Sequence, residues 1–256
     1  MRAGSPDSRR RLTRLNPDHG RHGAAWARLW LVAALIAGLA LTVLPATAVR
    51  AASIVVNRGD DFSAADGQCT LREAISAANT DTATGGCAAG SGADTITFAP
   101  GLTGPIKLTT DQLSISGDLT ITGPGANALT VQRSDAANTP LFRVFSIASG
   151  TVTITGLKIT NGNRASNGGG IFNSGNLTVA ASIISGNIGD NGGGIFNGTN
   201  GTLRVESSEI SGNTARTTGA GGGLYSNNNG VMTINGSTMV ASRISRIPSR
   251  IAGVER

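Results

Sequence analysis

Three carboxylates in the C-terminal half of the chain have the residue types that catalysis would need. Asp190, Glu206 and Glu209 are the acidic residues between Gly150 and Val240. Clustered carboxylates can bind calcium or act as acid and base in polysaccharide cleavage, often with a Lys or Arg that takes the proton. Glu206 and Glu209 flank one turn, and Asp190 lies about one repeat earlier, where it could approach them. We favour the alternative that all three are solvated turn residues.

The sequence offers few residues for other kinds of catalysis. Both histidines, His19 and His22, lie in the segment 1–48, which has the character of a leader. The rest of the chain therefore lacks Ser-His-Asp and Cys-His systems and His-ligated zinc. No glycine run is followed by Lys-Ser or Lys-Thr, so a phosphate-binding loop is not expected either. We expect no catalytic residue, no cofactor and no bound metal.

Two further groups of residues could bind a ligand. Asp60, Asp61 and Asp66 could bind calcium, but their spacing does not match an EF-hand loop, and turn formation is favoured. A recurring aromatic column could be a platform for sugars if it faces outward, although stacked aromatics are also ordinary ladder stabilisers, which is the favoured interpretation. This column consists of Phe172, Phe196 and Tyr225, which follow Ile171, Ile195 and Leu224.

These residues belong to a repeat. GGGIFN occurs at 168–173 and 192–197, and GGGLYS follows at 221–226. Four alternating segments recur at a nearly constant interval along the chain, and an apolar column follows each of them at a fixed offset. The segments are 151–154, 176–179, 202–205 and 231–234, and the column is Ile159, Ile184, Ile210 and Met239.

A fixed period of roughly 20 to 30 residues without helical spacing indicates a solenoid of strands. We predict an all-β fold, a single-stranded right-handed parallel β-helix with five or six coils over residues 101–240, each adding about 4.8 Å. In the alternating segments Leu177 and Val179 should point inward, whereas Thr178 and Arg204 should point outward. Glycine runs permit positive φ at corners, and asparagines can hydrogen-bond along a stack.

Residues 1–48 have the character of a secretory signal peptide. Six arginines from Arg9 to Arg28 precede an apolar run over 29–44, and Ala46-Thr47-Ala48 resembles a cleavage site. A retained N-terminal anchor is the alternative. We expect an exported protein, extracellular or at the cell surface or outer membrane, with no transmembrane span in the mature chain.

The net charge of +6 is concentrated at the two ends of the chain. Seven of the 21 Lys and Arg lie in residues 1–48 and four in 243–256, which leaves 10 basic and 12 acidic residues between 49 and 242. Because the predicted fold is near neutral and has no basic stripe, no nucleic-acid partner is expected.

Residues 53–100 are predicted to form a cap over one open end of the solenoid. Cys69 and Cys87 are the only cysteines, and a pair in an exported chain most often forms a disulfide. They enclose a short helix with an apolar face over Leu71–Ala78, for which Thr70 and Glu73 form a capping box. Arg72 is interpreted as a surface charge. Strands are expected at 53–57 and 95–98.

The block Cys69-Thr70-Leu71-Arg72-Glu73-Ala74-Ile75, with Asp66-Gly67 before it, resembles the CSLREA domain that precedes β-helix repeats in bacterial exported proteins. The segment 87–96 fits the same pattern. Similar GGGI repeats occur in polymorphic outer-membrane proteins and other autotransporter-like passengers, and the β-helix that the resemblance implies is pectin-lyase-like. Those proteins pair GGA[ILV] with FxxN, whereas here Gly175 and Thr199 stand three residues after Phe172 and Phe196.

The repeat pattern breaks in residues 241–256. Glycine and asparagine nearly vanish, and arginine recurs every three or four residues. This atypical basic tail is interpreted as a truncated or frameshifted end, with a tail that contacts an acidic envelope as the alternative.

The sequence thus favours a non-enzymatic exported scaffold that acts in adhesion or contacts polysaccharide or another cell-surface ligand. A carbohydrate-active enzyme of the pectate-lyase type and a truncated remnant of a longer surface protein are the alternatives.

Overall fold

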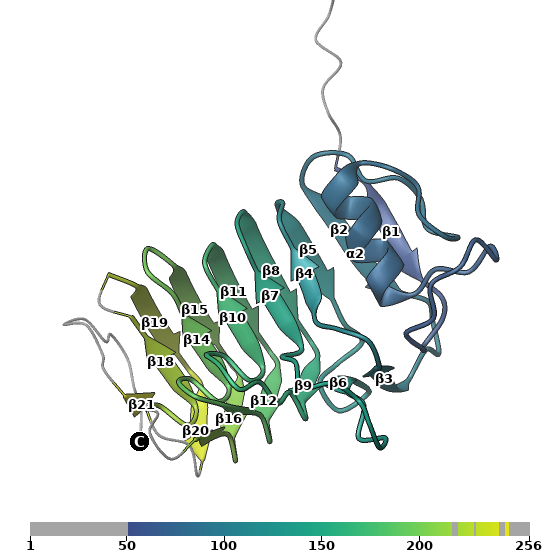
Figure 1. Ribbon diagram of the computed structural model, residues 1–256. Coiled ribbons are helices and arrows are strands. Elements are labelled where there is room, and N and C mark those ends of the chain that lie inside the picture. Colours follow the sequence, from purple (N-terminus) through teal and green to yellow (C-terminus); the bar gives the residue numbers. More distant parts are fainter. Residues whose placement is uncertain (1–50, 217–219, 228, 241–243, 246–256) are drawn as a thin grey trace, which may run out of the picture. The chain divides into compact units, whose positions relative to one another are not determined.

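A computed structural model of the protein describes residues 51–216, 220–227, 229–240 and the strand at 244–245. The proposed leader, residues 1–48, and nearly all of the basic tail lie outside this range. The described chain is a parallel β-solenoid of about six turns with one helix (Figure 1). The predicted all-β parallel β-helix is therefore confirmed.

Three sheets run along the stack of coils, and parallel strands of successive coils pair within each sheet. Sheet I contains β1 Ser53–Val56, β2 Asp94–Phe98, β5 Leu119–Thr122, β8 Thr151–Thr155, β11 Asn176–Ala180, β15 Thr202–Glu206 and β19 Val231–Asn235. Sheet II contains β4 Leu113–Ile115, β7 Phe145–Ile147, β10 Ile171–Asn173, β14 Ile195–Asn197, β18 Leu224–Ser226 and β21 Ile244–Ser245. Sheet III contains β3 Gly104–Leu108, β6 Leu129–Arg133, β9 Lys158–Thr160, β12 Ile183–Ser185, β16 Glu209–Ser211 and β20 Thr238–Val240. A short pair, β13 Ile188–Gly189 and β17 Thr214–Ala215, lies between sheets III and II along the chain.

Residues that the sequence repeat places in one column pair with one another on successive coils of the structure. Leu177 pairs with Leu203 and Ile184 with Ile210, and all four are buried. Thr178 and Arg204 face outward, as the two-residue period requires. The core is thus a set of aliphatic columns, one layer per coil.

The glycine triplets have two different structural roles. Gly168, Gly192 and Gly221 adopt φ values of 70°, 60° and 68°, which favour glycine. Gly169 has another requirement, because a Cβ there would collide with the carbonyl of Ile188 in the next coil. Corner geometry and close backbone packing together explain the run of three.

Buried asparagines form hydrogen-bonded ladders inside the coils. Nδ2 of Asn173 donates to Oδ1 of Asn197 at 2.7 Å, and Nδ2 of Asn187 donates to Oδ1 of Asn213 at 3.0 Å. Asn173, Asn187 and Asn197 are fully buried, so these bonds satisfy amides that would otherwise be costly to bury.

Residues 53–100, which we call the cap, include helix α2, Leu71–Thr80, at one end of the coils (Figure 1). The helix continues two residues beyond the predicted Ala78, because Asp81 ends it with a left-handed conformation. The Cys69–Cys87 disulfide is present, with a Cα–Cα distance of 4.7 Å. Strands β1 and β2 do more than cover the end, since they are the first two strands of sheet I.

Candidate functional site

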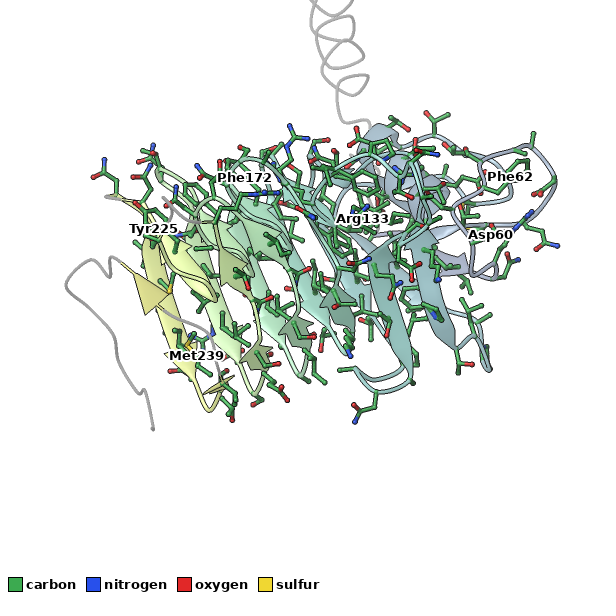
Figure 2. The ribbon with its side chains drawn as sticks, turned by 60° about the horizontal axis from the view of Figure 1, so that its bottom comes forward. Asp60, Phe62, Arg133, Phe172, Tyr225 and Met239 are labelled. Carbon is green, nitrogen blue, oxygen red and sulfur yellow. A yellow bond between two sulfur atoms is a disulfide. The ribbon has the colours of Figure 1, made fainter. Side chains whose placement is uncertain are left out.

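The aromatic column faces outward. Ile171 and Asn173 of β10 are buried, so Phe172 between them projects from the opposite face of the strand. The Phe172 and Phe196 rings stack with centroids 5.4 Å apart, and those of Phe196 and Tyr225 with centroids 5.3 Å apart. Figure 2 shows Phe172 and Tyr225 along one edge of the coils, away from Met239.

The stacking leaves few ring faces for a ligand. Interplanar angles of 9° and 7° turn the ring faces toward one another along the column, and Phe196 is only 5% exposed. A sugar that stacks on an aromatic residue needs an open ring face. The geometry therefore favours the ladder interpretation and leaves mainly ring edges at the surface.

Arg143 ends this stack and is the most unusual charged residue of the coils. Its Cζ lies 4.7 Å from the centroid of Phe172, and the residue is only 8% exposed. Within the described chain its Nε is buried without a hydrogen-bond partner. Burial, together with the charge of Arg164 and against the attraction of Asp111, lowers the pKa of Arg143 to about 10.

Two more arginines lie on the same edge of the coils. Asn163 N donates to Phe142 O, so the next residues on these neighbouring coils, Arg164 and Arg143, are placed near one another. Arg216 donates to Asn163 Oδ1 at 2.6 Å. We call Arg143, Arg164 and Arg216 the arginine edge.

Asp190 supplies a carboxylate at the arginine edge, 3.5 Å from Arg216. Sequence reasoning missed Arg143, because the segment 134–144 lies outside the repeated motifs. Arg143 becomes a candidate binding residue only in the folded protein, where it lies over the Phe172 ring.

The three candidate catalytic carboxylates do not form a cluster. Asp190 pairs with Arg216, whereas Glu206 accepts a hydrogen bond from Arg204 at 2.7 Å on sheet I. Glu209 belongs to β16 of sheet III. No group of three metal-binding side chains occurs anywhere in the part of the chain that the structure describes.

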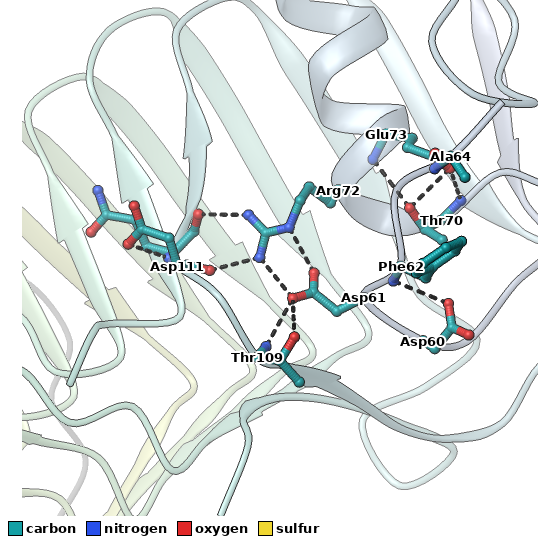
Figure 3. Close-up of polar contacts among 10 residues, drawn as sticks. Asp60, Asp61, Phe62, Ala64, Thr70, Arg72, Glu73, Thr109 and Asp111 are labelled. Atoms are coloured by element: carbon teal, nitrogen blue, oxygen red, sulfur yellow. Dashed lines mark hydrogen bonds and ion pairs between the residues drawn. The ribbon is translucent and has the colours of Figure 1, made fainter. Parts of the chain in front are cut away.

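The aspartates of the cap bind arginines. Asp60 and Asp66 pair with Arg58, and Asp61 accepts two hydrogen bonds from Arg72, at 2.7 and 3.1 Å (Figure 3). A pocket of about 720 Å³ lies beside them, lined in part by Asp60, Asp61, Phe62, Arg72 and Lys107. Its charges already have partners, including Asp135 for Lys107, so this pocket is a weaker candidate than the arginine edge.

Arg72 is more than the surface charge expected from the sequence. Besides Asp61, it donates to the backbone carbonyls of Asp111 at 2.7 Å and Gln112 at 3.1 Å (Figure 3). It thereby ties the cap helix to the chain around β4. The expectation failed because both acceptors are backbone atoms of a segment far along the chain, which no local pattern reveals.

Thr70 and Glu73 form the reciprocal capping box of α2. Glu73 is 1% exposed and accepts further from Ala64 N at 2.8 Å (Figure 3). These hydrogen bonds explain the burial of the Glu73 carboxylate by a structural role.

No protein-family model matches this chain, and no curated protein or solved structure matches it significantly. Among the described residues, no helix has the length and apolar character needed to cross a membrane.

Proposed function

We propose that this chain is an exported, non-enzymatic β-helix scaffold that contacts acidic polysaccharide at a cell surface. The cap would be a CSLREA domain, as the CTLREAI block suggests. The observation that carries the proposal is the buried guanidinium of Arg143, which ends an outward aromatic stack and whose Nε has no hydrogen-bond partner among the described residues.

The chemistry of arginine selects the class of sugar. Guanidinium presents donors in a planar fork that matches a carboxylate, and it binds most strongly where water is largely excluded. Arg143 and Arg164 lie close enough for their charges to interact, so together they favour an anion. Uronate residues supply carboxylates at regular intervals along a chain, and the edge of the partly buried Phe172 ring offers an apolar contact beside the charge.

The test is retardation in affinity electrophoresis with polygalacturonate, and neutral galactan serves as the reference polymer. The wild-type protein should be retarded by the acidic polymer alone, and more weakly as salt is raised. Arg143→Met should lose this retardation. Arg204→Met is the matched control, because it removes an equal charge from an exposed arginine on sheet I. Equal retardation of wild type and Arg143→Met would refute the site.

The non-enzymatic part of the proposal has its own readout. Incubation with polygalacturonate and calcium should yield no unsaturated uronate product. Release of such product by the wild-type protein would support the lyase alternative instead.

A further inference from the structure

Sheet I carries a second unusual surface, a regular array of threonines. Its outward positions on β2, β5, β8 and β11 form two columns, one on each side of a buried central residue. The first column is Thr95, Thr120, Thr153 and Thr178, and the second is Thr97, Thr122, Thr155 and Ala180. We call the seven threonines the threonine face.

The array is set by strand pairing. Thr120 pairs with Thr153, and Thr153 pairs with Thr178, in continuous parallel register. Neighbouring rows are therefore separated by about 4.8 Å, and the two columns by about 6.6 Å, twice the rise per residue. The threonines thus project from a nearly rectangular lattice of backbone positions.

The threonine hydroxyls are available to a ligand. No hydrogen bond joins any of the seven hydroxyls to another group of the described chain. Thr122 is exposed, and the other six threonines are partly buried. The face is uncharged from β2 to β11, and charge returns on β15 with Arg204 and Glu206. An uncharged lattice of hydroxyls and methyls suits an uncharged, periodic, hydrogen-bonding partner.

We propose that the threonine face binds ice. With O–H···O distances of about 2.75 Å, tetrahedral geometry places second-neighbour oxygens about 4.5 Å apart and repeats the lattice about every 7.3 Å along its axis. Both spacings lie close to those of the threonine face. The row spacing differs from the ice spacing by about 0.3 Å per coil, or about 1 Å over four rows, and the column spacing differs by about 0.7 Å once. Side-chain rotation can absorb both differences.

The methyl groups support the same partner. Each threonine presents a methyl group beside its hydroxyl, and its β-branched side chain has restricted χ1 freedom. Little conformational entropy is therefore lost when the array orders against a surface. Water between the methyls can be held in place by the hydroxyls of adjacent rows.

The test measures thermal hysteresis and incorporation of the fluorescently labelled protein into a growing ice hemisphere. Wild type should show both. Thr153→Tyr, in the centre of the face, should abolish both, because a large ring breaks the plane while tyrosine is still well tolerated in strands. Thr153→Val should weaken hysteresis roughly two- to tenfold, the equivalent of one lost hydrogen bond.

Thr130→Tyr on β6 is the matched control, since Thr130 is an outward threonine of sheet III beside Lys158. It should retain full activity. The absence of hysteresis and of ice incorporation in wild type, or equal losses in Thr153→Tyr and Thr130→Tyr, would overturn the proposal. Retention on crystalline cellulose that Thr153→Tyr abolishes, without hysteresis, would assign the face to another partner and also overturn it. Arg143→Met should bind ice normally, because this surface is independent of the arginine edge.

Discussion

The cap and the coils are stabilised by different kinds of interaction. The cap depends on contacts that occur once, including the Cys69–Cys87 disulfide, the Glu73 capping box and the pair of Arg72 with Asp61. The coils depend on contacts that recur, in aliphatic, asparagine and aromatic columns. A contact that occurs once holds two particular segments together, whereas a contact that recurs stabilises the fold through the sum of its copies. Removing one contact of the cap should therefore leave its other contacts intact, whereas removing a contact in one coil should also weaken the neighbouring coils.

The largest effect should come from a charge placed inside a coil. Leu203→Asp buries a carboxylate between Leu177 and Met232 and should lower the free energy of unfolding by roughly 3–5 kcal/mol. Thr178→Asp should cost less than about 1 kcal/mol, because it stays in water beside Arg204. Urea unfolding of both variants measures the contrast, and equal losses would contradict the register.

The disulfide should give the largest effect within the cap. Replacing Cys69 and Cys87 with Ala should lower the free energy of unfolding by about 2–4 kcal/mol, because the bond closes a loop of 18 residues. Urea unfolding gives the value. Reductant should reproduce the loss in wild type and leave the double variant unchanged, and two free thiols in oxidised protein would contradict the bond.

The junction of cap and coils should be sensitive to Arg72. Arg72→Met removes the charged partner of Asp61, whose side chain is only 2% exposed, and should cost about 2 kcal/mol. Adding Asp61→Asn should recover part of this loss. Thermal unfolding of the single and double variants is the measurement, and additive losses would show that the two side chains are not coupled.

The asparagine ladders should make a smaller contribution per rung. Asn187→Ala leaves Gly162 N without its acceptor and should cost about 1–2 kcal/mol. Asn176→Ala, at an exposed position on sheet I, is the control and should change stability by less than about 0.5 kcal/mol. Similar losses in urea unfolding would mean that burial of the ladder has no energetic importance.

The smallest expected effect is an increase in stability. Ala181 adopts a φ of 45° at the corner between β11 and β12, where the equivalent residues of other coils include Gly156 and Gly236. Ala181→Gly should raise the free energy of unfolding by about 1 kcal/mol, because alanine is strained in the left-handed region. Ala128→Gly, in a turn without positive φ, should give no gain in the same thermal unfolding measurement.

The sequence predicts the coils better than it predicts the sites. The inward columns, the disulfide and the helix follow from periodicity and spacing, because each is a local or repeated pattern. The direction of Phe172 was left open, since either column could have faced the core until Asn173 proved to be buried with Ile171. Arg143 and the acceptors of Arg72 depend on contacts between unrelated segments, and neither repeats.

The nearly constant spacing between paired strands along the chain also has a kinetic meaning. Parallel pairing usually folds slowly, because distant segments must meet before any contact stabilises them. Here each strand needs only the coil before it, so the loop-closure entropy is nearly the same at every step. Since β1 and β2 are both the cap and the first rungs of sheet I, the disulfide-tied cap can serve as the nucleus on which the coils are added in order.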